Sequence, residues 1–307
     1  MSKNSKIGGV IAVLVTPYHA DGSVDTEGME TLCRRVANAG CNGAFVAGST
    51  GDMALLGHRD RCAILRAARK GLGDNAQLFA GVTDFYFDGI EENTRVFADL
   101  GVDVGVLMPP LMFFKYSANE MTEWFRRAAD SSPLPILLYH HMRVSTPIPL
   151  ETILAVAKHP NIIGMKETSQ TIDRTYEILD TIRNEDFVFL QGREAFALDS
   201  LLHGADGLLA ALGCIVPEYY ATLWEAFQKK DMHRVQEINA KLDRLAGIFD
   251  LMPTDKSFSY FGYALKKALM YRGWTDNATS RIPGFEPDPA FDEVLFEFLK
   301  SIDFPTA

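Results

Sequence analysis

Residues 161–170 read NIIGMKETSQ, so a short apolar run ends in a lysine. Pro160 precedes the run and polar residues follow Lys166, which favours a buried strand over a helix. A lysine that loses water at the end of such a strand has a lowered pKa, and its neutral amine can form a Schiff base with a carbonyl group. The alternative is a lysine that pairs with Glu167 or extends to solvent.

Two further strand ends carry groups that suit this chemistry. The segment GSTGD at 48–52 offers the hydroxyls of Ser49 and Thr50, which can donate to a carboxylate without bringing a competing charge near the amine. It is not a P-loop, because no Gly-Lys-Ser/Thr follows, and an ordinary turn is the alternative. Tyr139 ends the run PILLY, where a phenol can transfer protons or simply pack its ring at the rim. Hydroxyl neighbours such as Thr50 would tune the pKa of this phenol, so Thr50 is predicted to be catalytic together with Lys166 and Tyr139.

The pair His140-His141 follows Tyr139 directly. Neighbouring residues at a strand end point to opposite sides, and no His, Asp or Glu set has metal-ligand spacing, so we expect no metal site. We expect one of the two histidines to line the pocket, and we predict His140 to be a substrate contact.

The elements that must position these residues alternate along the chain. Eight apolar runs lie at 10–15, 43–47, 77–81, 104–108, 135–139, 161–165, 186–190 and 206–211. Segments with helical spacing lie at 26–39, 58–72, 87–100, 117–131, 149–158, 170–183 and 194–203. This order predicts an α/β fold, a (β/α)₈ barrel over 1–215, in which the active site lies at the carboxyl ends of the strands; an open doubly wound sheet is the alternative. Four further helical segments predict a C-terminal helical extension over 216–307, packed on the barrel.

The composition limits the partners. A formal net charge of −10 argues against a nucleic-acid or anionic-membrane surface, and no apolar stretch approaches the roughly 20 residues of a membrane span. The N-terminus leads into only a short apolar run, so we expect a cytoplasmic protein. The four cysteines have no paired spacing and are expected to be buried thiols.

Together and in this order, these segments resemble the dihydrodipicolinate synthase/N-acetylneuraminate lyase family of class I aldolase-type barrels. The matching stretches are GVIAVLVTPYHADGSVD, AGSTGD, the strand-ending Tyr, GMKET, GREAFALDSLLHGADGLLAA and RIP. The resemblance implies a homo-oligomer, a tetramer or dimer, without metal or other cofactor. It also implies roles for particular residues. Lys166 forms a Schiff base with pyruvate or another 2-oxo acid, Tyr139 is the acid/base, Ser49 and Thr50 hold the carboxylate, and the backbone near Gly192 and Leu209 assists.

Departures from the family pattern narrow this expectation. The synthase branch has an Arg five residues after the Tyr, where this chain has Val144, with Arg143 one place earlier as a predicted substrate contact. MPPLMFFKY lacks the relay tyrosine pair, and His-His-Met at 140–142 replaces the usual Asn-x-Pro. Asp52 stands for the family's Glu. These changes disfavour a lysine-pathway synthase and a sialic-acid lyase.

The sequence therefore predicts a lyase, an aldolase or dehydratase, acting on a small-molecule 2-oxo acid such as a 2-keto-3-deoxy aldonate or a 4-hydroxy-2-oxo acid. Aldol cleavage and dehydration share the imine and then diverge, and the sequence does not place the groups that separate them. The alternatives are a synthase-like condensation of pyruvate with an aldehyde, a non-catalytic 2-oxo-acid sensor, and an unrelated phosphate-binding barrel.

Overall fold

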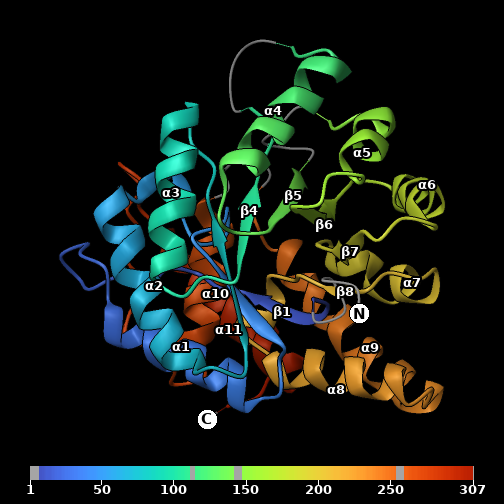
Figure 1. The fold of residues 1–307 in the computed structure, drawn as a ribbon. Coiled ribbons are helices and arrows are strands. Elements are labelled where there is room, and N and C mark those ends of the chain that lie inside the picture. The colour runs from blue at the N-terminus through green and yellow to red at the C-terminus, as the bar shows by residue number, and fades with distance from the viewer. Residues whose placement is uncertain (1–6, 111–114, 142–146, 254–258, 307) are drawn as a thin grey trace.

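The structure is a computed structural model that describes residues 7–110, 115–141, 147–253 and 259–306. Eight parallel strands close into a barrel in chain order, and the last strand pairs with the first (Figure 1). They are β1 (Gly9–Val13), β2 (Gly43–Val46), β3 (Gln77–Gly81), β4 (Val104–Leu107), β5 (Ile136–His141), β6 (Ile162–Thr168), β7 (Val188–Gln191) and β8 (Gly207–Leu208). This closure confirms the predicted (β/α)₈ barrel, and the open doubly wound sheet is wrong.

A helix follows each of the first seven strands and covers the outside of the barrel (Figure 1). These helices are α1 (Thr26–Asn38), α2 (His58–Leu72), α3 (Phe87–Asp99), α4 (Ala118–Ser131), α5 (Leu150–Val156), α6 (Ile172–Ile182) and α7 (Ala197–Leu202). Local sequence sets their starts: the Asp25 side chain caps α1, and Ser117 and Glu120 form a capping box at α4. Short 3₁₀ turns are η1 (Met53–Leu55), η2 (Glu194–Phe196), η3 (Leu212–Cys214) and η4 (Gly247–Phe249).

The C-terminal part of the chain is helical, as predicted. Its helices are α8 (Pro217–Gln228), α9 (Met232–Ala246), α10 (Ser259–Tyr271) and α11 (Pro289–Ser301). Helix α8 contacts α1 and β1, where the eighth helix of a (β/α)₈ barrel belongs. The boundary predicted between 215 and 216 therefore falls between β8 and its own helix, and we count α8 with the barrel.

Strands β5 and β6 run further than the sequence indicates. Tyr139 is the register partner of Lys166, and pairing continues through His140 with Glu167 and His141 with Thr168. The predicted strands end at 139 and 165, because polar residues follow there. Each strand supplies backbone partners to the other, so the ladder extends over these polar residues and fixes which face each one occupies.

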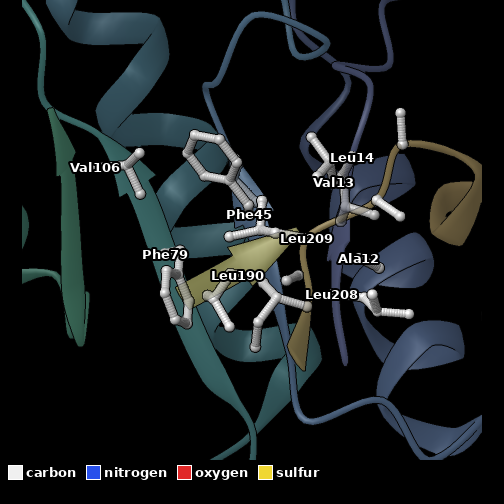
Figure 2. Packing of buried hydrophobic residues seen from close by; sticks show 14 of the residues in the cluster. Ala12, Val13, Leu14, Phe45, Phe79, Val106, Leu190, Leu208 and Leu209 are labelled. Carbon is white, nitrogen blue, oxygen red and sulfur yellow. The ribbon is translucent and has the colours of Figure 1, made fainter. Parts of the chain in front are cut away.

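The barrel interior is filled by large apolar side chains. Figure 2 shows Phe45, Phe79, Leu190 and Leu209 lying together, each at most 1% exposed. Leu190 is the register partner of Lys166, so these apolar side chains surround the lysine within the barrel. Such packing leaves no aqueous pore, and a polar group at this level is removed from bulk water.

Two smaller predictions concern the chain as a whole. Among the described residues, no helix has the length and apolar character that crossing a membrane requires. All four cysteines are buried and free, as their spacing predicts. Burial raises the pKa of the Cys33 thiol, which keeps it protonated.

Candidate active site

Lys166 lies near the carboxyl end of β6 with its side chain in the barrel interior, 3% exposed. Its Nζ is 4.2 Å from the ring centroid of Tyr139 and 5.3 Å from that of Phe45. None of the described carboxylates is within ion-pairing distance of this amine. Burial lowers the pKa of Lys166 to about 7, against the opposing charge of Glu194. Half the amine is therefore neutral near pH 7.

Tyr139 carries a transferable proton beside Lys166. It is 2% exposed, and its hydroxyl lies 3.0 Å from the Ser49 Oγ. The ring meets Phe45 edge-on at 6.4 Å between centroids. Burial raises the pKa of Tyr139, and the hydrogen bond to Ser49 opposes that rise. The phenol is thus protonated at neutral pH and can first act as an acid.

The loop after β2 brings Ser49 to Tyr139 and holds Thr50 beside it, 5% exposed. Ala47 begins this loop at φ 54°, in the left-handed region that residues other than glycine rarely adopt. The Thr16 hydroxyl, three residues after β1, donates to the Gly51 carbonyl at 2.7 Å. Contacts with neighbouring strands therefore maintain a strained turn, which is common at functional sites.

The far end of the same loop is tied to the C-terminal helices. Asp52, at φ 60°, forms an ion pair with Lys266 of α10, with 3.3 Å between Oδ2 and Nζ. Lys266 also donates to the Thr279 carbonyl at 2.9 Å and lies 4.3 Å from the ring centroid of Tyr18. Burial lowers the pKa of Lys266, and Asp52 opposes that change. No local sequence pattern points to this lysine, because its partner is distant along the chain.

Gly192 and Leu209 follow β7 and β8, and the close packing is at Gly192. A Cβ at Gly192 would be 2.6 Å from the Lys166 Cε and 2.4 Å from the Thr168 Oγ1, so the close approach requires glycine. Leu209 is fully buried, and its N–H donates to the Gln191 carbonyl at 2.8 Å. The end of β7 therefore lies against the lysine side chain, on the side of β6 away from β5.

Glu194 is a site residue to which the sequence assigned no role. Its Oε1 accepts from the N–H groups of Ala211 at 2.8 Å and Leu212 at 3.3 Å. Burial raises the pKa of Glu194, while these hydrogen bonds and Lys166 oppose the rise. It is the acidic group with the clearest electrostatic influence on Lys166. In the sequence, Glu194 lies among the polar residues that follow the apolar run at 186–190, and this position is the signal that could have identified it.

The structure separates the two histidines. His140 points out of the barrel, and its Nδ1 is 2.7 Å from the Glu167 Oε1, with both side chains at most 1% exposed. The prediction that His140 contacts the substrate in the pocket is therefore wrong. Side chains alternate along β5, so Tyr139 points inward and His140 points outward. His141 is on the inner face, with its ring 5.9 Å from that of Tyr139. Arg143 lies outside the described residues.

The assembled group is an amine, a phenol, hydroxyls and backbone N–H groups within a closed barrel end. A partly neutral amine beside a protonated phenol is equipped to add to a ketone and to supply a proton to the departing oxygen. Among the described residues, no three His, Cys, Asp or Glu side chains come together as metal ligands.

Comparison with known proteins supports one family over nearly the whole chain. An uncharacterized DapA-like lyase from Thermococcus onnurineus is 28% identical over 297 residues, covering 96% of this chain and 99% of the relative. A 4-hydroxy-tetrahydrodipicolinate synthase from Corynebacterium urealyticum is 29% identical over 286 residues, covering 92% and 91%. Each of these alignments covers more than nine-tenths of both chains.

A solved structure gives the same fold. YagE, a prophage protein of the dihydrodipicolinic acid synthase family from E. coli K12 in complex with pyruvate, has a TM-score of 0.90, with 23% identity and coverage of 97% and 99%. The profile of the Dihydrodipicolinate synthetase family matches residues 6–293. Members of this family are class I aldolase-type lyases, which confirms the prediction of an enzyme of that class. The chain belongs to the Dihydrodipicolinate synthetase family.

Proposed function

We propose that this chain is a Schiff-base-forming lyase of a 2-oxo acid, with Lys166 as the nucleophile. The observation that carries the proposal is the buried Lys166 amine, 4.2 Å from the Tyr139 ring and with its pKa lowered to about 7. An ordinary lysine is almost entirely protonated at neutral pH and attacks carbonyl groups slowly. The family resemblance and this geometry support the same nucleophile.

The first half-reaction follows from the groups present. The neutral Lys166 nitrogen adds to C2 of the 2-oxo acid, and one proton passes from this nitrogen to the carbonyl oxygen, which gives a neutral carbinolamine. Tyr139 then protonates the hydroxyl, which leaves as water, and a protonated imine remains. The imine accepts the electron pair released when a bond at C3 breaks, either C3–H or C3–C4, and becomes an enamine. The hydrogen bond to Ser49 offers a path by which Tyr139 regains its proton.

The substrate carboxylate is assigned to the loop after β2. Ser49 and Thr50 provide hydroxyl donors there, and the backbone beside Gly192 and Leu209 closes the opposite side. Neutral donors suit this role. A cation beside Lys166 would further lower the pKa of the Lys166 amine and would compete with it for the substrate carboxylate.

The distal part of the substrate is assigned to the inner face of β5. His141 lies beyond Tyr139 on this face, so we transfer the pocket role from His140 to His141. An imidazole can hydrogen-bond a C4 hydroxyl, as a 2-keto-3-deoxy aldonate or a 4-hydroxy-2-oxo acid carries. His141 would then accept the hydroxyl proton in aldol cleavage or donate one to the leaving hydroxyl in dehydration. Arg143 stays a predicted contact outside the described residues.

Reductive trapping tests the covalent step. The protein is incubated with pyruvate and sodium borohydride, digested, and analysed by mass spectrometry. We expect one reduced pyruvate on the Lys166 peptide and none on the peptide of Lys266, the second buried lysine. An unmodified Lys166 would overturn the proposal. A panel of 2-oxo sugar acids, scored for pyruvate release against a dehydrated product, then separates cleavage from dehydration. Pyruvate supplied with an aldehyde tests condensation, and an adduct without any turnover would favour a sensor.

The pH dependence of imine formation follows from the lowered pKa of Lys166. Only the neutral amine attacks, so the trapping rate with pyruvate and cyanoborohydride should rise with pH, reach half its maximum near the pKa of about 7, and then level off. The measurement is the initial rate of adduct formation by mass spectrometry from pH 5.5 to 9. A rate that still climbed steeply at pH 9 would contradict a lowered pKa.

The ion pair between Lys266 and Asp52 gives a prediction about substrate affinity. In K266M, Asp52 loses its charged partner, so the loop that carries Ser49 and Thr50 loses support. We expect the pyruvate concentration for half-maximal trapping to rise about tenfold, and the free energy of unfolding to fall by about 1–3 kcal/mol.

The neighbouring lysine provides a matched control for K266M. Lys267 is on the same helix and is paired with Asp292 at 2.7 Å, away from the loop. K267M removes the same charge and also breaks an ion pair, but it should leave the pyruvate dependence of trapping unchanged. An equal effect of both variants on this dependence would show that the Asp52 contact has no special role.

We also propose that the chain forms a homo-oligomer, a tetramer or dimer, as the resemblance implies. The adjacent rings of Phe85 and Tyr86 support an interface, because they are 65% and 61% exposed after β3. Large exposed aromatic side chains are typical of protein contacts. Light scattering coupled to size-exclusion chromatography should give a mass of two or four chains of 34.1 kDa. A mass of one chain at micromolar concentration would contradict the proposal.

A further inference from the structure

A second polar pair lies directly behind Tyr139 and Lys166. His140 and Glu167 are register partners in β5 and β6, one residue beyond the catalytic pair. Because side chains alternate along a strand, this second pair faces the helical layer and not the barrel interior. Its Nδ1 to Oε1 distance is 2.7 Å, and both side chains are at most 1% exposed. Both pairs bridge β5 and β6, one on each face of the sheet.

The outer pair carries polar groups that the fold does not require. The Ser169 hydroxyl also donates to the Glu167 Oε1. The His140 Nε2 and the Glu167 Oε2 are buried and have no hydrogen-bond partner among the described residues. Burying such groups is unfavourable, and apolar residues of similar size would pack there without that penalty. Stability alone is therefore a poor reason for this pair.

Glu167 connects three strands. Its side chain binds His140 of β5, while its backbone carbonyl accepts from the Gly192 N–H at the end of β7, at 2.7 Å. Lys166 precedes Glu167 directly, and Gly192 is the residue that packs against the Lys166 Cε. The position of Glu167 thus fixes the backbone of the nucleophile relative to the strands on both sides.

We infer that His140 is a positioning residue, which holds Lys166 against Tyr139 through its hydrogen bond to Glu167. The inference rests on the proposed Schiff-base function. A carboxylate only accepts hydrogen bonds, so the His140 Nδ1 carries the proton and donates it. If this bond is lost, the end of β6 can shift relative to β5, and a shift of about 1 Å at a reacting group can slow a reaction about a hundredfold.

Two substitutions of His140 separate the hydrogen bond from other effects. In H140N, the amide nitrogen occupies nearly the place of Nδ1 and keeps the donor, whereas H140L removes it. The readout is the exchange of the pyruvate methyl protons for deuterium in D₂O, followed by ¹H NMR, which requires the imine and enamine but no second substrate. We expect H140N to stay within about threefold of the wild type, and H140L to lower the maximal exchange rate by about 10- to 100-fold. The KM for pyruvate should change less than about threefold, because the carboxylate loop is untouched.

A double variant controls for folding. H140L leaves the Glu167 carboxylate buried without its histidine, which lowers stability by itself, whereas H140L/E167L removes both polar groups. We expect the double variant to recover the thermal midpoint lost in H140L and still to exchange slowly.

Three results would overturn the inference. They are wild-type exchange in H140L, recovery of exchange together with stability in H140L/E167L, and slow exchange in H140N. A wild-type protein that neither exchanges pyruvate protons nor forms the borohydride adduct would instead overturn the proposed function, and this inference with it. If the wild type forms the adduct and the His140 variants exchange protons normally, only the positioning role of His140 is wrong.

Discussion

Replacement of Lys166 by Met is expected to abolish the pyruvate adduct and to lower turnover by about 10⁴-fold or more. Met has a similar length and fills the space beside the Tyr139 and Phe45 rings, so the barrel interior should stay packed. What it lacks is the amine, and none of the described residues offers a second one in the barrel interior. The measurements are borohydride trapping, exchange of pyruvate methyl protons, and release of pyruvate from the substrate found in the panel.

The same variant should be more stable than the wild type. The native pKa of Lys166, about 7, is below its ordinary value of 10.5, so the folded state disfavours the ammonium form. This cost is fully present below pH 7, where both states are protonated, and it disappears as pH rises toward 10.5, where both are neutral. We expect K166M to gain about 1–3 kcal/mol in the free energy of unfolding at pH 7, with a smaller gain at pH 9.

Lys158 provides the control for Lys166. It is an exposed lysine in the turn before β6, and K158M removes one positive charge without touching the barrel interior. Both the adduct and the stability of K158M should match the wild type. A K166M protein that still released pyruvate at more than a few per cent of the wild-type rate would end the assignment of Lys166 as nucleophile.

Replacement of Tyr139 by Phe is expected to lower the maximal rate by about 10²- to 10⁴-fold, the contribution typical of a positioned acid or base. Phe keeps the ring beside Lys166 and its edge-on contact with Phe45, but it loses the hydroxyl that lies 3.0 Å from Ser49. Water loss from the carbinolamine and proton transfer at C3 should both slow. The adduct should still form on long incubation, because the nucleophile is intact.

The comparison of Y139F with K166M therefore distinguishes the two roles. Y139F should accumulate adduct slowly, and K166M should form none. Tyr176, on the outer helix α6 and stacked on His203, gives a matched control, since Y176F removes a phenol hydroxyl far from the site. Wild-type exchange of pyruvate protons by Y139F would show that another group transfers the proton.

The sequence alone determined the architecture and grouped the candidate residues of the site. Buried parallel strands appear as short apolar runs and the covering helices as periodic segments, so the alternation predicts a closed barrel. The barrel in turn places every strand end on one rim. This is why Lys166, Tyr139 and Ser49, which are far apart in sequence, could be grouped before their distances were known.

The tertiary structure decided which residue faces which side. The register between β5 and β6 shifts between Ile136 and Leu137, and it is this pairing that sets Tyr139 opposite Lys166. A slip of one residue would exchange the two faces of a strand, so the inward place of His141 and the outward place of His140 depend on strand pairing that no local pattern encodes.

Long-range contacts and the degree of burial also cannot be predicted from local sequence patterns. Lys266 and Asp52 are 214 residues apart, and only the packing of α10 over the barrel end brings them together. The pKa of Lys166 is set by how completely the barrel removes water from its amine, which is a property of the assembled core. The sequence thus determined which chemical groups are present at the rim, whereas the fold determined their orientation, their partners and their protonation, because these depend on register and desolvation.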